Sequence, residues 1–173
     1  QAAQHFDRLA ERYPLLKSYH ALYGGRSYLL AQLPADSLRR LAMVPSDSVL
    51  DCDARFLRGE AQRELGGAER ERAVASYRAY LSACPASGQT QRWLAQEHCA
   101  ELLDALGRPA EALQLWRRLY IEAPTENFGT LAQRRLERQG TKVAAFSAAE
   151  LLERAQVLFE GMRNPESEAA YRW

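Results

Sequence analysis

Stretches of mixed apolar and polar residues along this 173-residue chain are separated by Pro and Gly, which divide it into helix-sized pieces. The apolar residues in these pieces are chiefly Ala and Leu, of which the chain has 29 and 25. The β-branched residues that favour strands are scarce, with five Val, one Ile and four Thr. Because Ala and Leu lose little free energy on entering a helix, the sequence predicts an all-α protein.

Pro, Gly and one capping pattern set the expected helix boundaries. The pairs Gly24-Gly25 and Gly66-Gly67 are expected to end helices, because glycine readily adopts the left-handed conformation of a helix C-terminus. Pro109 is expected at the start of its helix, and Ser147 with Glu150 is a capping box. The expected helices are 2–12, 15–23, 26–33, 35–43, 48–65, 69–83, 88–106, 109–123, 127–139 and 148–160, with a short last helix after Pro165.

Consecutive helices pair, and two of the pairs resemble each other at an offset of 39 residues, which sets Pro85 over Pro124. Each unit has a small residue in the first helix, a turn with Gly, and a second helix with Ala, an aromatic residue four positions later and a closing Pro. Small residues let two antiparallel helices approach closely, and the aromatic residue fills the gap towards the neighbouring unit. The other matched positions are Ala61 with Ala100, Ala73 with Ala112, Tyr77 with Trp116, Tyr80 with Leu119, and Cys84 with Ala123.

This pattern is similar to that of tetratricopeptide repeats. The residues that carry the resemblance are Gly107, Ala112, Trp116 and Pro124 in the clearer unit, and Ala61, Ala73, Tyr77 and Pro85 in the other. The offset exceeds the tetratricopeptide period of about 34 residues, so we expect an irregular tetratricopeptide-like α-solenoid of antiparallel helix pairs. Residues 1–47 would form its N-terminal short helices, 48–140 two helix pairs and a following helix, and 141–173 the C-terminal end of a truncated array.

Several segments also resemble the superhelical region of periplasmic soluble lytic transglycosylases. They are Phe6 and Leu9, Tyr13–Leu16, Tyr19, Ala21, Leu22 and Tyr23, Leu38–Leu41, Leu115–Pro124, and Leu151–Ala155 with Leu158-Phe159. In that family the superhelix precedes a lysozyme-like domain that cleaves peptidoglycan strands. The resemblance assigns no catalytic residue here, because the glutamates lie in Arg-rich helical contexts and Gly161-Met162 is followed by Arg163 instead of a Gly-Leu-Met-Gln-like run.

Charge and composition exclude several functional classes. The chain has 23 Lys and Arg against 22 Asp and Glu, so its net charge of +1 predicts no nucleic-acid partner. No apolar run approaches the roughly 18 residues of a transmembrane helix. The chain starts with Gln1 instead of Met, from which we expect a segment of a longer protein.

The residues that carry most enzymatic chemistry form no recognisable motif here. Cys52, Cys84 and Cys99 are odd in number and lack a CxxC spacing, which argues against a disulfide framework but leaves one bridge and one spare thiol open. The adjacent His98 and Cys99 point about 100° apart on a helix and cannot share a metal ion. We therefore predict no catalytic, cofactor-binding or metal-binding residues.

The exposed aromatic and basic residues of the expected solenoid are the candidates for a partner-binding surface. They are Tyr19, Tyr23, Trp93, Arg117, Arg134 and Arg138. Tyrosine and tryptophan can clamp a peptide or stack on a sugar, and arginine pairs with carboxylates. An unpaired last helix would also expose Leu158, Phe159, Tyr171 and Trp173, which predicts self-association through the C-terminal end.

Together these features predict a non-catalytic helical-repeat scaffold or protein-interaction segment. The resemblance implies a periplasmic or cell-envelope location, with a protein or a peptidoglycan-related molecule as the partner. The alternative is a cytoplasmic tetratricopeptide adaptor that binds a partner peptide. An enzyme that uses this segment as its catalytic part is a third class, and no nucleophile, metal or cofactor motif supports it.

Overall fold

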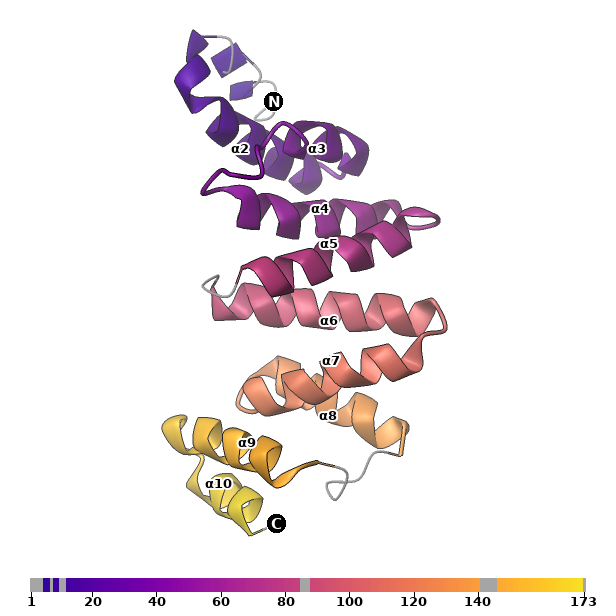
Figure 1. Cartoon of the computed structure of the whole chain (residues 1–173), viewed down its shortest axis with the longest axis vertical. Coiled ribbons are helices and arrows are strands. Elements are labelled where there is room, and N and C mark those ends of the chain that lie inside the picture. The colour runs from indigo at the N-terminus through magenta and orange to yellow at the C-terminus, as the bar shows by residue number, and fades with distance from the viewer. Residues whose placement is uncertain (1–4, 7, 10–11, 85–87, 141–145, 173) are drawn as a thin grey trace. The chain divides into compact units, whose positions relative to one another are not determined.

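The computed structural model describes residues 5–6, 8–9, 12–84, 88–140 and 146–172. The regular structure in these ranges is entirely helical, which confirms the all-α prediction (Figure 1). It consists of η1 (Pro14–Leu16), α2 (Lys17–Leu30), α3 (Pro34–Leu41), α4 (Asp51–Leu65), α5 (Glu69–Ala83), α6 (Gln89–Ala105), α7 (Pro109–Glu122), α8 (Asn127–Arg138), α9 (Ala148–Glu160) and α10 (Asn164–Tyr171). The expected helix at 2–12 lies largely outside the described residues.

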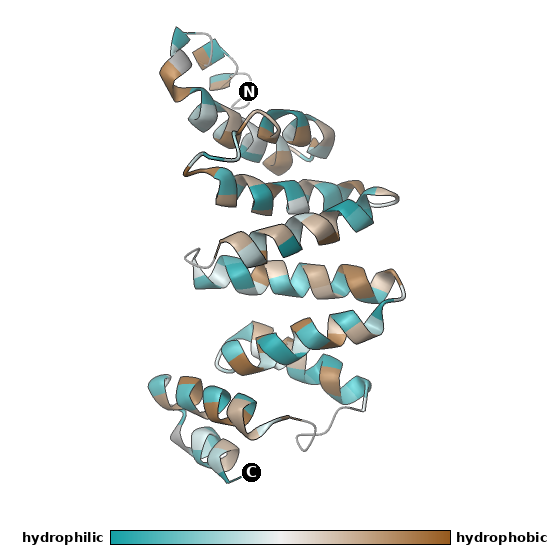
Figure 2. Cartoon of the chain, in the orientation of Figure 1, coloured by the Kyte–Doolittle hydropathy of each residue, from teal (hydrophilic) through white to brown (hydrophobic). Residues whose placement is uncertain are grey.

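The chain contacts define two compact units, one that extends to residue 87 and one that begins at Gly88. In the first unit α2 packs on α3, α3 on α4, and α4 on α5. In the second unit α6 packs on α7, α7 on both α8 and α9, and α9 on α10. Hydrophobic and hydrophilic residues are interleaved along the same helices, as in helices that are part buried and part exposed (Figure 2).

The prediction that a helix ends at Gly24-Gly25 is wrong, because α2 continues through both residues to Leu30. Both glycines are buried against neighbouring parts of the first unit. A Cβ atom on Gly25 would lie 2.7 Å from Cγ of Leu41 in α3. Close packing of α2 on α3 therefore accounts for Gly25, whereas Gly66-Gly67 ends α4 as predicted, with φ angles of +66° and +51°.

The helix pair α4–α5 has its closest approach at Gly59. A Cβ atom there would lie 2.7 Å from Cε1 of Tyr77, and the Tyr77 ring is fully buried. The Tyr77 hydroxyl donates a hydrogen bond of 2.6 Å to the carboxylate of Glu60 in α4. Gly59 thus leaves room for the aromatic ring, and the Glu60 carboxylate provides the hydrogen-bond acceptor that the buried Tyr77 hydroxyl needs.

The pair α6–α7 repeats this arrangement with different residues. Trp116 in α7 is fully buried, and its indole N–H donates a hydrogen bond of 3.1 Å to Asp104 in α6. The five matched positions predicted from the offset of 39 residues are buried in both pairs, with exposed fractions of 2% or less. The second helices also end in register, at Ala83 and Glu122.

Three further features fix the C-terminal half of the second unit. Gly129 in α8 lies against the end of α7, where an added Cβ atom would be 2.8 Å from the carbonyl carbon of Ala123. The predicted capping box at the start of α9 is confirmed, since Ser147 and Glu150 each accept a hydrogen bond from the other's backbone N–H. The C-terminal helix α10 is held on α9 by the buried Ser167, whose hydroxyl donates to the Ala155 carbonyl at 2.9 Å.

We predict that Gly59→Ala destabilises the first unit, although glycine-to-alanine changes inside helices normally stabilise by roughly 0.5–1 kcal/mol. The added methyl must displace the buried Tyr77 ring, and such overpacking costs about 1–3 kcal/mol. Gly24→Ala is the matched control, because its Cβ atom would lie at an ordinary 3.5 Å from the nearest atom. Chemical denaturation of the two variants measures the difference; equal or increased stability of Gly59→Ala would refute the close approach.

Candidate functional site

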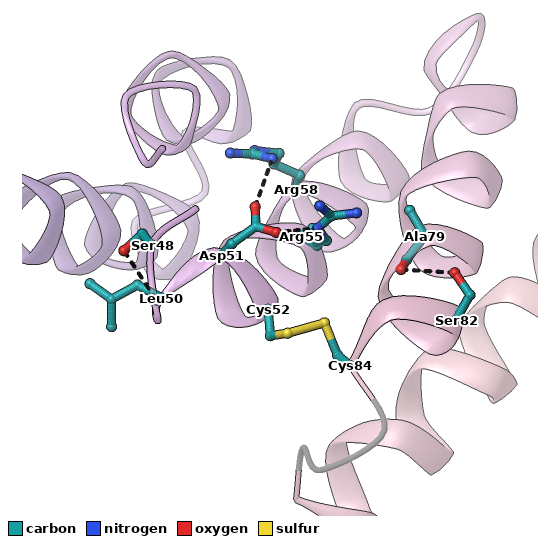
Figure 3. The surroundings of a disulfide bond; sticks show 9 residues. All are labelled: Ser48, Leu50, Asp51, Cys52, Arg55, Arg58, Ala79, Ser82 and Cys84. Atoms are coloured by element: carbon teal, nitrogen blue, oxygen red, sulfur yellow. Dashed lines mark hydrogen bonds and ion pairs between the residues drawn. A yellow bond between two sulfur atoms is a disulfide. The ribbon is translucent and has the colours of Figure 1, made fainter. Parts of the chain in front are cut away.

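The most distinctive chemical group in the first unit is a disulfide bond between Cys52 and Cys84 (Figure 3). Cys52 lies in the first turn of α4 and Cys84 caps the C-terminus of α5, with their Cα atoms 5.7 Å apart. The bond therefore closes the end of the helix pair opposite the Gly66-Gly67 turn. Of the alternatives left open by the sequence, the structure has one bridge, and Cys99 is buried in α6 outside it.

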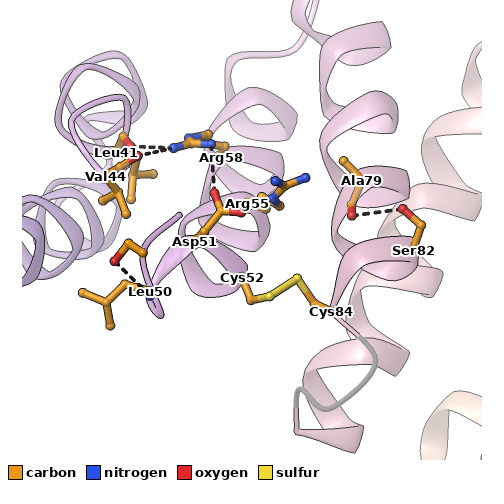
Figure 4. Close-up of polar contacts among 11 residues, drawn as sticks. Leu41, Val44, Leu50, Asp51, Cys52, Arg55, Arg58, Ala79, Ser82 and Cys84 are labelled. Atoms are coloured by element: carbon orange, nitrogen blue, oxygen red, sulfur yellow. Dashed lines mark hydrogen bonds and ion pairs between the residues drawn. A yellow bond between two sulfur atoms is a disulfide. The ribbon is translucent and has the colours of Figure 1, made fainter. Parts of the chain in front are cut away.

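Beside the disulfide, Asp51 and two arginines connect α4 to the preceding helix (Figure 4). The Asp51 carboxylate accepts a hydrogen bond from Arg55 and lies 4.0 Å from the Arg58 guanidinium. Arg58 in turn donates to the backbone carbonyls of Leu41 at 2.9 Å and Val44 at 3.3 Å. Asp51 thus links two arginines to the first turn of α4, where a negative charge also interacts favourably with the helix dipole.

Two kinds of feature are absent from the part of the chain that the structure describes: a cluster of metal-ligating side chains and a membrane-spanning helix. There, no three His, Cys, Asp or Glu side chains are placed to share a metal ion. His98 and Cys99 are adjacent on α6 but differ in burial, with Cys99 fully buried and His98 half-buried. Among the same residues, no helix combines the length and apolar character needed to span a bilayer.

Tyr19 and Tyr23 lie one turn apart on α2, and both side chains are largely accessible, with exposed fractions of 45% and 43%. The ring of Phe6 stacks on Tyr23 with their centroids 6.1 Å apart. These two candidates therefore form one exposed aromatic face in the first unit.

Trp93, Arg134 and Arg138 belong to the second unit and occupy two different settings. Trp93 is half-buried in α6 and packs against Phe128 of α8, with ring centroids 5.9 Å apart. Arg134 and Arg138 are exposed one turn apart on α8, and neither forms an ion pair within the described part of the chain. The two arginines remain available to a partner, whereas the Trp93 ring contributes to helix packing.

Arg117 is engaged between α7 and α9. Its guanidinium donates to both carboxylate oxygens of Glu150, at 3.0 and 2.9 Å, and lies 4.3 Å from the centre of the Phe146 ring. Burial acts to raise the pKa of Glu150, but hydrogen bonds from Ser147 and Arg117 outweigh it, and the pKa falls below its ordinary value. Arg117 therefore stabilises the fold and offers little of its charge to a partner.

The residues expected to drive self-association differ in how far their side chains are exposed. Leu158 is only 3% exposed and lies in the core between α9 and its neighbours, so it cannot take part in such a contact. Phe159 and Tyr171 are exposed by 58% and 50%. Trp173 lies outside the described residues.

Sequence reasoning missed the pairings that join distant residues. The disulfide spans 32 residues and the Arg117–Glu150 bond 33, and no local motif marks either. The three cysteines left one bridge open, but nothing in the sequence indicated that Cys52 and Cys84 form it.

Comparisons with known proteins identify no relative of this chain. No protein-family model, no curated protein and no solved structure matches it.

We predict that removal of the disulfide by Cys52→Ser with Cys84→Ser lowers the stability of the first unit by roughly 3–4 kcal/mol, the loop-closure value for a loop of this length. Reduction of the wild-type chain should give a similar loss in a thermal or denaturant melt. Dithiothreitol should have no effect on the double variant, which controls for other effects of the reductant. A wild-type melting curve unchanged by reduction would contradict the bridge.

Arg117→Ala should destabilise the second unit by about 1 kcal/mol at neutral pH, the upper range for a partly exposed ion pair. Because the pKa of Glu150 is depressed in the folded chain, its contribution is full above its unfolded pKa and is lost as the pH falls through the folded value. The difference between wild type and variant should therefore shrink in denaturation curves below about pH 4. Arg134→Ala, at an exposed arginine on α8, should change stability by less than about 0.5 kcal/mol at any pH.

Proposed function

We propose that this chain is a non-catalytic helical-repeat segment that binds a protein partner. In this proposal the helix pairs follow one another as an irregular tetratricopeptide-like α-solenoid, and the second helix of each pair contributes to one curved docking surface. The observation that carries it is the repeated helix pair: α4–α5 and α6–α7 bury the same five positions, among them a large aromatic residue of the second helix, Tyr77 or Trp116. Repetition of one packing unit is the basis of solenoid proteins.

We further propose that the segment works in the periplasm or cell envelope, as part of a protein similar to the lytic transglycosylases. The disulfide supports an oxidising compartment, because such bonds are rare in proteins of the reducing cytosol. The segments that resemble the superhelical region of that family supply the second argument. The partner would then be another envelope protein or a peptidoglycan-related molecule.

The alternative is a cytoplasmic tetratricopeptide adaptor. The same helix pairs would serve it equally well, because repeat scaffolds present peptide-binding surfaces in any compartment. The disulfide separates the two proposals, since a cytosolic protein would hold Cys52 and Cys84 as thiols.

Thiol trapping of the full-length protein in its own cells tests the location. Cells are lysed in denaturant with one alkylating reagent, then reduced and treated with a second, isotopically distinct one. Mass spectrometry should find Cys99 with the first label, and Cys52 and Cys84 with the second. The first label on all three cysteines would refute the envelope location and favour the cytoplasmic adaptor.

The non-catalytic assignment has its own readout. The purified chain, incubated with isolated peptidoglycan, should release no anhydro-muropeptides, with a known lytic transglycosylase as the positive control. Their release by the chain alone would show that it is an enzyme.

A further inference from the structure

The charge balance of the whole chain conceals a stretch without any acidic residue. Residues 12–35 contain Arg12, Lys17 and Arg26 but no Asp or Glu. The same 24 residues carry seven of the fifteen large hydrophobic side chains that are exposed in the described part of the chain. An apolar surface that bears only positive charge is a feature of binding surfaces and is unusual on an inert helix.

Within this stretch, five exposed residues form a stripe along α2, which we call the α2 seam. They are Leu16, Tyr19, Tyr23, Arg26 and Leu30, at alternating spacings of three and four residues. At 100° per residue they fall within an arc of roughly 80°. Leu16, Tyr19, Tyr23 and Leu30 have exposed fractions of 47%, 45%, 43% and 78%.

The α2 seam lies opposite the face by which α2 joins its own unit. Ala21, Gly24 and Gly25 on that other face are buried, and Gly25 makes the close contact with Leu41 of α3. The stripe is therefore not part of the fold's own core. The ring of Phe6 packs on Tyr23, so that one side of this aromatic residue is already held in place.

The geometry of the stripe selects the kind of partner. An alternating three- and four-residue spacing in a narrow arc is the pattern by which one helix packs along another, as in a coiled coil. A helix that lies on a membrane instead presents a wide apolar face. The α2 seam is narrow, which favours a protein helix over a lipid surface.

Arg26 specifies the charge of that partner. It stands inside the apolar stripe, is exposed, and forms no ion pair within the described residues. Burying an arginine in an interface is costly unless a carboxylate faces it. Lys17, at the start of the same helix, adds a second positive charge that nothing on α2 neutralises.

We infer that the α2 seam is a docking site for an acidic amphipathic α-helix of another protein. The partner helix would place apolar residues at three- and four-residue spacing against Tyr19, Tyr23 and Leu30, and an Asp or Glu against Arg26. Because α2 lies outside the two repeated helix pairs, this surface is separate from the curved surface proposed above. Its failure would leave that proposal standing.

Site-specific photocrosslinking in the full-length protein tests the inference. A benzoylphenylalanine at position 19, expressed in the native cells, should give a discrete adduct with one other protein, and mass spectrometry should map it to a helical segment rich in Asp and Glu. The same crosslinker at position 64, an exposed position on α4 and so outside both proposed surfaces, should give no such adduct.

Charge reversal makes the test specific. Arg26→Glu should reduce the adduct yield at position 19 at least tenfold, because it opposes the partner's acidic residue. Arg70→Glu, at an exposed arginine of α5, is the matched control and should leave the yield unchanged. Both changes are on the surface, and thermal melts should show that both variants fold as the wild type does.

The inference is overturned if position 19 crosslinks only to lipid, to another segment of the same chain or to a second copy of it. It is equally overturned if no adduct exceeds that at position 64, or if the yield is insensitive to Arg26→Glu. As a second measurement, a fluorescent heptad peptide with Leu at its core positions and Glu at the flanking ones should bind the purified chain. Its counterpart with Lys in place of Glu should bind at least tenfold more weakly, and equal binding would contradict the role of Arg26.

Discussion

Each of the two repeated helix pairs buries a large aromatic ring from its second helix, and in α4–α5 a glycine of the first helix makes room for it. In α4–α5 the ring is that of Tyr77, and Gly59 leaves room for it. Any side chain in place of Gly59 would force the ring or the backbone to shift. Burial of the ring, and then the neighbouring Glu60 carboxylate, raise the pKa of Tyr77 well above its ordinary value. The hydroxyl therefore remains a neutral donor to Glu60 at any physiological pH, and the polar end of the ring is satisfied.

The repeat could be predicted from the sequence because this constraint is local. A small residue, an aromatic residue four positions after an alanine, and a closing proline leave a pattern that can be compared between two segments, and the matched positions are buried. The same approach wrongly predicted a helix end at Gly24-Gly25, because glycine occurs both at helix ends and at points where two helices pack closely. What distinguishes the two uses here is the contact of Gly25 with Leu41, which lies sixteen residues further along the chain. A local sequence pattern does not include that contact.

The candidate binding residues were less predictable, because exposure depends on contacts between distant segments. Arg117 and Arg134 look alike in the sequence, yet Glu150 engages the first, and the second is open to solvent. Many of the other arginines are neutralised within their own helices, as Arg72 is by Glu69 and Arg118 by Glu122. Because so many arginines are paired locally, an arginine within an apolar stripe that forms no ion pair among the described residues is informative.

The disulfide is not part of the packing pattern that the two helix pairs share. At the offset of 39 residues, Cys52 and Cys84 correspond to Gln91 and Ala123, so the pair α6–α7 closes without a covalent bond. That pair buries the larger Trp116 and satisfies its indole N–H with Asp104, which supplies more apolar area than the ring of Tyr77. At α4–α5 the bond between Cys52 and Cys84 adds a covalent restraint in place of the Gln91 and Ala123 of the other pair. Such a bond stabilises by limiting the unfolded states of the loop that it closes, here residues 52–84, so its direct effect is confined to this helix pair.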